Sequence, residues 1–190
     1  MMRKVNKVKV LSDEADLLRT EEEFAEVIAQ RSAHVIEVMR QRGTSPLEMT
    51  RLKSAIEFAK EAHKLQRRKS GAPYVIHPIS VACIAAEELK LDVNSVICAF
   101  LHDVVEDTEY TIEDIRDRFG EDVAFLVDVV TKKKKDRYHM SKQVDNYKQL
   151  LDSLNYDIRA LMVKIADRLH NMRTLSSMRP DKQMKIAGET

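Results

Sequence analysis

Apolar side chains recur along most of this chain every three or four residues, which is the period of an α-helix that buries one face. No segment alternates between apolar and polar residues as a half-buried strand does. We therefore expect an all-α fold of short helices packed around two central apolar ones. The pattern predicts helices over residues 20–42, 45–66, 77–89, 93–105, 111–119, 123–130, 141–154 and 156–171, with a last one beginning near Arg179.

The most apolar of these helices, residues 93–105, carries four ionisable residues at and just beyond its end. They are His102, Asp103, Glu106 and Asp107. A helix without a wide polar face should be buried on most sides. Burying a carboxylate there costs several kcal/mol, on the order of the loss of its hydration, unless a cation or hydrogen bonds compensate. A bound metal ion would provide that cation.

Length and charge indicate one globular domain without a strong global field. We expect residues 1–44 to form a helical lead-in packed on the core and residues 45–190 to form the main domain. With 32 Lys and Arg against 31 Asp and Glu, the net charge of +1 does not favour binding to nucleic acid or to an anionic membrane. Any attraction for anions must be local.

The two cysteines, Cys83 and Cys98, lie in apolar helical segments without the spacing of a metal or redox motif. We interpret them as reduced core residues of a cytoplasmic protein. No stretch reaches the roughly 20 apolar residues that a membrane-spanning helix needs. The sequence thus predicts a soluble, cytoplasmic protein.

Two short segments concentrate positive charge. Glycine and proline break the helical period in residues 67–74, so this segment predicts a loop carrying Arg67, Arg68 and Lys69. The loop is either a local anion site or a solvated basic turn. Residues 132–135 are four consecutive lysines, which we interpret as a mobile loop that is mostly solvated or reaches over bound phosphates.

Three separate predicted helices offer metal-ligand residues: His77, the pair His102 and Asp103, and Asp167. Two imidazoles and two carboxylates suit a divalent ion such as Mn²⁺, Fe²⁺ or Zn²⁺. Four protein ligands on an ion that prefers six leave positions for water and substrate. Each residue alone has a simpler interpretation, because a buried histidine often packs in a core and a helical aspartate often pairs with a neighbouring base.

The joint pattern resembles the H…HD…D signature of the HD-domain phosphohydrolases. The segments around these ligands, Arg68–Pro78, Leu101–Thr108 and Ala166–Leu175, are similar to the hydrolase domain of the RelA/SpoT family of alarmone enzymes. The resemblance covers roughly residues 45–190. It implies the helical HD fold and a metal-dependent phosphohydrolase.

The resemblance also implies a reaction: Mn²⁺, or another divalent ion, would support removal of the 3′-pyrophosphate from guanosine tetra- and pentaphosphate in the stringent response. The products would be GDP or GTP and pyrophosphate. The implied metal ligands are His77, His102, Asp103 and Asp167; Glu106 and Asp107 would serve the attacking water; and Arg68, Lys69, Ser70, Asn171 and Thr174 would contact the nucleotide.

Two departures from the family pattern are visible. Ala72 stands where many relatives carry glutamate. The larger enzymes also continue into synthetase and regulatory domains, so we expect this chain to be the N-terminal piece of a long form whose C-terminal partner domains are missing. Three alternatives remain: an HD-type hydrolase of another nucleotide, a regulatory module that binds a nucleotide without turnover, and a helical interaction domain with structural polar groups.

Overall fold

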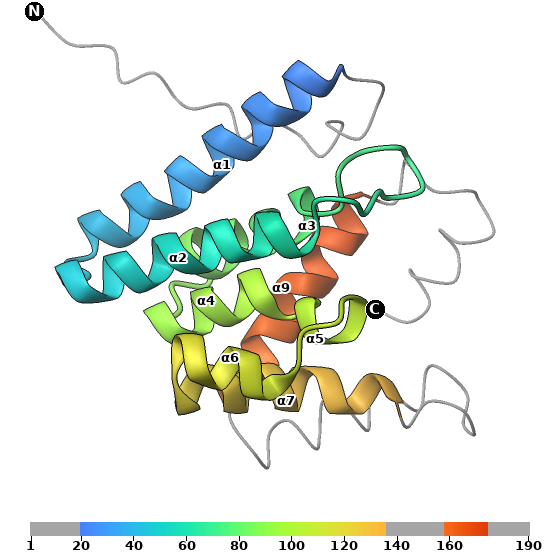
Figure 1. Cartoon of the computed structure of the whole chain (residues 1–190). Coiled ribbons are helices and arrows are strands. Elements are labelled where there is room, and N and C mark those ends of the chain that lie inside the picture. Colours follow the sequence, from blue (N-terminus) through green and yellow to red (C-terminus); the bar gives the residue numbers. More distant parts are fainter. Residues whose placement is uncertain (1–19, 136–157, 175–190) are drawn as a thin grey trace, which may run out of the picture.

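The computed structural model describes residues 20–135 and 158–174, and all regular elements in these two ranges are helical (Figure 1). The all-α prediction is confirmed. The predicted helices at 141–154 and after Arg179 lie outside the described residues. The elements are α1 Glu21–Gln41, α2 Pro46–Ala62, α3 Ile76–Cys83, the π-helix η2 Ile84–Glu88, α4 Val93–Leu101, α5 Val104–Asp107, α6 Ile112–Phe119, α7 Glu121–Lys135 and α9 Ile158–Arg173.

Three of the helices begin with a reciprocal capping box, in which a hydroxyl and a carboxylate each satisfy a backbone N–H of the first turn. One box joins Ser45 to Glu48, and Pro46 takes the first helical position. The other two boxes join Thr20 to Glu23 and Thr111 to Asp114. These starts follow from local sequence alone.

The central element is α4, which packs against α2, α3, α7 and α9. Every residue from Ser95 to Leu101 is buried. Figure 1 shows α9 crossing behind α4 and α3, although α9 lies far from both in the sequence. This arrangement brings the beginning of α3, the end of α4 and the middle of α9 together.

The predicted helix over residues 93–105 is interrupted in the structure. Helix α4 ends at Leu101, His102 and Asp103 form a turn, and the short helix α5 follows. The imidazole Nδ1 of His102 lies 2.6 Å from the carbonyl oxygen of Ala99. In an uninterrupted helix that carbonyl would accept from the backbone N–H of Asp103. The His102 side chain therefore competes with the helical ladder at the place where the helix ends.

The predicted helix over residues 77–89 also changes form before its end, because η2 replaces α-helix from Ile84 onward. After it, Lys90 adopts a left-handed conformation with φ of 52°. The guanidinium of Arg42 donates to the carbonyl oxygens of Lys90 and Leu91 at 2.8 and 2.7 Å. These bonds satisfy backbone acceptors where the helix terminates.

The lysines at 132–135 correct one prediction. Their backbone belongs to the last turn of α7, whereas we expected a loop. Lysine is a good helix former, and no glycine or proline breaks this segment. Their side chains lie outside the described residues, so the predicted role near phosphates stays a prediction.

The basic loop is a closed turn that α1 covers. The Tyr74 N–H donates to the carbonyl of Gln66 at 2.9 Å, and the Arg68 N–H donates to the carbonyl of Ala72 at 2.8 Å. Gly71 has φ of +91°, a conformation that glycine adopts at little cost. Ala72 is fully buried in a small apolar cluster; its other buried members are Phe24, Val27 and Ile76.

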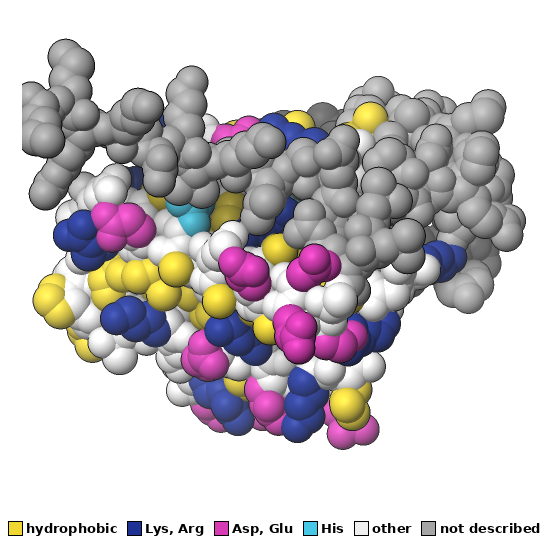
Figure 2. Space-filling model, turned by 90° about the horizontal axis from the view of Figure 1, so that it is seen from above, with side chains coloured by type: hydrophobic (Ala, Val, Ile, Leu, Met, Phe, Trp, Pro, Cys, Tyr) yellow, Lys and Arg dark blue, Asp and Glu magenta, His cyan; other side chains and the backbone are white. Residues whose placement is uncertain are grey.

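Charged side chains of both signs are interspersed over the face seen in Figure 2, in keeping with the balanced composition. Among the helices that the structure describes, none has the length and apolar character needed to cross a bilayer. Helix α1 packs on α2, α3 and η2. The domain boundary at residue 45 stays a prediction.

Candidate metal centre

Four side chains expected as metal ligands converge from three parts of the fold. His77 lies in the first turn of α3, His102 and Asp103 form the turn after α4, and Asp167 lies in α9. All four residues are buried. The sequence prediction that these distant residues share one site is therefore supported by their placement.

The ligand atoms form a tight cluster. His77 Nε2 lies 2.9 Å from Asp167 Oδ1, and His102 Nε2 lies 3.1 Å from Asp103 Oδ2. The crossed pairs, His77 with Asp103 and His102 with Asp167, are 3.6 and 3.5 Å apart. One imidazole nitrogen from each of His77 and His102 and one carboxylate oxygen of Asp167 all lie within 4.8 Å of one another. This spacing allows one ion to contact several of them.

Electrostatics in the cluster favour a positive charge. Burial lowers the pKa of His102, but the neighbouring Asp103 and Asp167 carboxylates outweigh it and raise that pKa to about 10. Burial also acts to raise the pKa of Asp167, yet its hydrogen bonds with His102 and His77 hold that pKa well below the usual range. A positive charge beside it thus stabilises the buried Asp167 carboxylate as an anion.

The donor set fits a divalent metal ion. Because a carbonyl oxygen can only accept, the contact with Ala99 assigns the ring proton of His102 to Nδ1. With Nδ1 as the donor, Nε2 is the nitrogen that would offer its lone pair to a metal ion, after losing the proton that the carboxylates favour in the ion's absence. The Nε2 atom is buried and faces the carboxylates of Asp103 and Asp167, at 3.1 and 3.5 Å. Two imidazole nitrogens and two carboxylates are ligands that Mn²⁺, Fe²⁺ and Zn²⁺ accept.

Further side chains orient these ligands. The Tyr74 hydroxyl donates to Asp103 Oδ2 at 2.7 Å, and the Asn171 amide donates to Asp167 Oδ1 at 3.4 Å. Nδ1 of His170 lies 2.7 Å from Nδ1 of His77. The roles of Tyr74 and His170 were missed from the sequence, although both residues stand inside the segments that carry the family resemblance.

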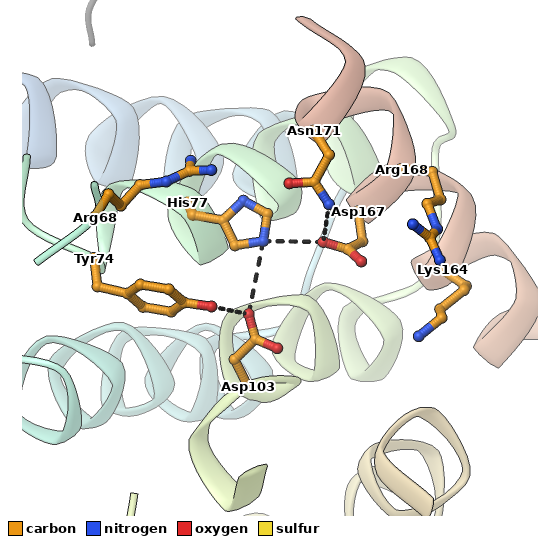
Figure 3. A pocket seen from close by; sticks show the side chains of 8 residues that line it. All are labelled: Arg68, Tyr74, His77, Asp103, Lys164, Asp167, Arg168 and Asn171. Atoms are coloured by element: carbon orange, nitrogen blue, oxygen red, sulfur yellow. Dashed lines mark hydrogen bonds and ion pairs between the residues drawn. The ribbon is translucent and has the colours of Figure 1, made fainter. Parts of the chain in front are cut away.

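A cavity of about 200 Å³ opens beside the cluster (Figure 3). The close-up shows cationic side chains on two sides of it, from the basic loop and from α9. Arg68 and Asn171, both expected as nucleotide contacts, are part of its wall. Its lining residues are Arg68, Tyr74, His77, Asp103, Lys164, Asp167, Arg168 and Asn171.

Two of these cations, Lys164 and Arg168, were not expected. Lys164 is buried, one helical turn before Asp167, and Arg168 follows Asp167 directly. A spacing of three residues places Lys164 and Asp167 on one side of α9. That spacing was the only signal available in the sequence, and ion pairing of the helix surface explained it equally well.

The adjacent arginines of the basic loop differ in their surroundings. Arg67 forms a two-bond ion pair with Glu21 of α1, at 2.9 and 3.0 Å. Arg68 points into the cavity, and among the described residues none accepts a hydrogen bond from its buried Nη1 atom. A buried donor of this kind is typical of a site that receives an anion.

Besides His102, which lies behind the cavity wall in the ligand cluster, five predicted site residues are not part of that wall. Lys69 and Ser70 are exposed on the loop. Thr174 is buried and its hydroxyl donates to the carbonyls of His170 and Asn171. Glu106 is half-buried and Asp107 is exposed, both on α5. The functional roles of these residues stay predictions.

Asp107 nevertheless lies near the cluster. Burial, followed by the charges of Asp103 and Asp107, raises the pKa of Tyr74 well above its usual value, and both carboxylates interact with its hydroxyl. The phenol therefore stays protonated and remains a donor. The Asp107 backbone carbonyl also accepts from the Gln66 amide at 2.5 Å, which fixes α5 beside the end of α2.

Comparisons with known proteins agree with this geometry. The sequence profile of the HD domain matches residues 55–190. The bifunctional (p)ppGpp synthase/hydrolase SpoT of Escherichia coli K12 is 46% identical over 145 residues, which cover 75% of this chain and 20% of that protein. The guanosine-3′,5′-bis(diphosphate) 3′-pyrophosphohydrolase of Haemophilus influenzae is 49% identical over 135 residues, or 70% of this chain and 20% of the relative.

A solved structure, described as a metazoan ortholog of SpoT that hydrolyzes ppGpp and plays a role in starvation responses, superposes with a TM-score of 0.62 at 30% identity. The match covers 77% of this chain and 84% of that one. The chain spans about a fifth of the length of the curated relatives that it matches. It belongs to the HD-domain family, and within it to the RelA/SpoT branch.

Proposed function

We propose that this domain is a metal-dependent hydrolase that removes the 3′-pyrophosphate from guanosine tetra- and pentaphosphate. One observation carries the proposal: the buried cluster of His77, His102, Asp103 and Asp167 opens onto a cavity with cationic walls. The names of the relatives support this substrate, because they are (p)ppGpp hydrolases. The products would be GDP or GTP and pyrophosphate.

The charges around the cavity suit a polyphosphate. Arg68, Lys164 and Arg168 line it together with only two carboxylates, Asp103 and Asp167. His77, His102, Asp103 and Asp167 would hold a divalent ion, which would supply Lewis acidity toward a phosphoryl oxygen and toward the attacking water. The three cationic side chains bind phosphate oxygens and stabilise the negative charge that develops as the pyrophosphate leaves. A neutral or cationic substrate would not be stabilised by this excess of positive side chains.

In this proposal Glu106 and Asp107 accept the proton of the attacking water. Their position supports the role, since α5 begins directly after the predicted ligand Asp103 and Asp107 interacts with the Tyr74 hydroxyl beside it. A carboxylate that takes up a proton in the transition state accelerates such a reaction by roughly 10²–10⁴-fold. Arg68 of the basic loop and Asn171 of α9 both line the cavity, and in this proposal they orient the nucleotide.

The ion that we propose is Mn²⁺. The mixed nitrogen and oxygen ligands support a borderline divalent ion, and Mn²⁺ retains positions for water and substrate when the protein supplies four ligands. The predicted C-terminal synthetase and regulatory partner domains and the cytoplasmic location stay predictions.

The test is pyrophosphate release from guanosine tetraphosphate by the 190-residue chain with Mn²⁺, with an EDTA control. We expect turnover that requires the metal and falls by at least about a hundredfold in the Glu106→Gln, Asp107→Asn double variant. The matched control, Glu109→Gln with Asp117→Asn, removes two exposed carboxylates elsewhere and should retain turnover.

Three outcomes would contradict the proposal in different ways. Tight nucleotide binding without pyrophosphate release would indicate a regulatory binding module. Equal turnover of nucleotides that lack a 3′-diphosphate would indicate an HD hydrolase of broader or different specificity. Full activity of the Glu106 and Asp107 double variant would remove these two carboxylates from the mechanism.

A further inference from the structure

His170 and His77 form a buried contact that the proposed reaction does not itself require. Their Nδ1 atoms lie 2.7 Å apart, and the residues are 2% and 4% exposed. The contact joins α9 to α3 across 93 positions of sequence. Two ring nitrogens at this distance share a proton, so one of them donates and the other accepts.

The other nitrogen of His77 determines which way this bond runs when the site holds a metal ion. His77 Nε2 faces the carboxylates, 2.9 Å from Asp167 Oδ1. A metal ligand must offer a lone pair, so Nε2 of a liganding His77 carries no proton. The ring proton then sits on Nδ1 and donates to Nδ1 of His170.

His102, the second histidine of the cluster, also donates from Nδ1, but its acceptor is a backbone carbonyl. His102 Nδ1 donates to the backbone carbonyl of Ala99, at 2.6 Å. His77 has no such carbonyl as a partner for Nδ1 among the described contacts, and the imidazole of His170 takes its place. Each histidine of the cluster therefore has a defined acceptor for the proton on its Nδ1 atom.

We propose that His170 is a positioning residue that fixes the metal-binding tautomer and ring orientation of His77. The proposal rests on the metal centre assigned under the proposed function. His170 lies three residues after Asp167, so α9 supplies one ligand and also holds a second ligand that belongs to α3. Partners of this kind change metal affinity by 10–100-fold, on the order measured for other metal sites.

The experiment compares the Mn²⁺ dissociation constant of three variants with that of the unmodified chain, using the EPR signal of the free ion. His170→Leu removes the acceptor and should weaken binding by about 10–100-fold. His170→Asn keeps an acceptor on the same side-chain carbon, because Oδ1 of asparagine replaces Nδ1, and should stay within about threefold of that value. Val163→Ala, a buried apolar change in α9, should destabilise the fold without weakening Mn²⁺ binding.

A purely structural role predicts another pattern. Equal Mn²⁺ affinity for His170→Leu and the unmodified chain would overturn the proposal, as would equal weakening by the Leu and Asn variants. A measurement without substitution keeps the test valid if His170→Leu does not fold. Long-range ¹H–¹⁵N NMR of the Zn²⁺-loaded chain should show the His77 proton on Nδ1, and a proton-free Nδ1 would overturn the proposal.

Activity separates this proposal from the one on which it rests. An unmodified chain that binds Mn²⁺ but releases no pyrophosphate contradicts the hydrolase function and leaves the role of His170 to the affinity data. If the unmodified chain is active and the His170→Leu variant binds Mn²⁺ with unchanged affinity, only the proposed role of His170 is contradicted.

Discussion

The hydroxyl of Tyr74 donates a hydrogen bond of 2.7 Å to Oδ2 of Asp103. Tyr74 closes the basic loop that presents Arg68, whereas Asp103 belongs to the metal cluster at the end of α4. The bond therefore joins the loop expected to hold the nucleotide to a residue expected to hold the ion. The position of each affects the other through a single hydroxyl.

Replacing Tyr74 with phenylalanine removes that donor and little else. A hydrogen bond to a charged group contributes about 1.5–3 kcal/mol, so we expect Mn²⁺ affinity to fall by roughly tenfold or more. Calorimetric titration with Mn²⁺ measures the change. Tyr110→Phe is the matched control, because Tyr110 packs on Phe58 at a ring distance of 4.6 Å, away from the cluster. Unchanged affinity in Tyr74→Phe would show that Asp103 needs no such orientation.

The two arginines of the basic loop should differ in function. We expect Arg68→Gln to raise KM for guanosine tetraphosphate by about tenfold or more, because its guanidinium lines the cavity and charge-assisted bonds to phosphate are strong. Arg67→Gln should change KM little, since Arg67 pairs with Glu21 and exposed pairs of this kind contribute about 0–1 kcal/mol. Steady-state kinetics gives KM for both variants. An equal rise in KM would mean that the loop acts through its net charge alone.

Local sequence was enough to predict most of the helices. The apolar period and the capping boxes at Ser45 and Thr111 act within one or two turns, so they can be read from neighbouring residues. The interruption after Leu101 could not be predicted in this way. It depends on the hydrogen bond from the His102 ring to the Ala99 carbonyl, and helix propensities do not predict which acceptor a side chain will bond.

The convergence of the expected metal ligands could be predicted because residue chemistry and family resemblance pointed to the same four positions. His77, His102, Asp103 and Asp167 were expected as ligands and lie together. Lys164 and His170 were not expected, because their roles depend on how α9 approaches α3 and the cavity, which only tertiary packing decides. Thr174 was expected near the nucleotide, but its hydroxyl bonds to the backbone of α9.

Metal binding should stabilise the fold through Asp167. A ligand that binds only the folded state adds about 2.7 kcal/mol when its free concentration is about a hundredfold above Kd. In a domain of this size that corresponds to a rise in Tm of about 5–10 °C. Scanning calorimetry with and without Mn²⁺ should show this rise for the unmodified chain and for Asp117→Asn, an exposed carboxylate. Asp167→Asn should abolish most of it, and an undiminished rise would exclude Asp167 as a ligand.

His63 should make the fold sensitive to mild acid. It is 1% exposed, its Nδ1 lies 2.7 Å from Gln66 Oε1, and burial lowers its pKa. A base with a lowered folded pKa binds fewer protons in the folded state than in the unfolded state. Above the unfolded pKa of about 6.5 the imidazole is neutral in both states, so its protonation does not affect the free energy of unfolding. Below that pH the unfolded state takes up the proton more readily, so the free energy of unfolding falls.

The comparison with His63→Leu isolates this contribution. Urea unfolding in EDTA at about pH 7.5 and about pH 5.5 gives the free energy of unfolding of both proteins without metal uptake. We expect the unmodified chain to lose about 1 kcal/mol relative to the variant over this interval, since a single proton contributes at most about 1.4 kcal/mol per pH unit. Parallel losses in the two proteins would mean that His63 takes up its proton in the folded state. The Gln66 amide would then hold an imidazolium beside α5, and acid sensitivity would have to come from another buried group.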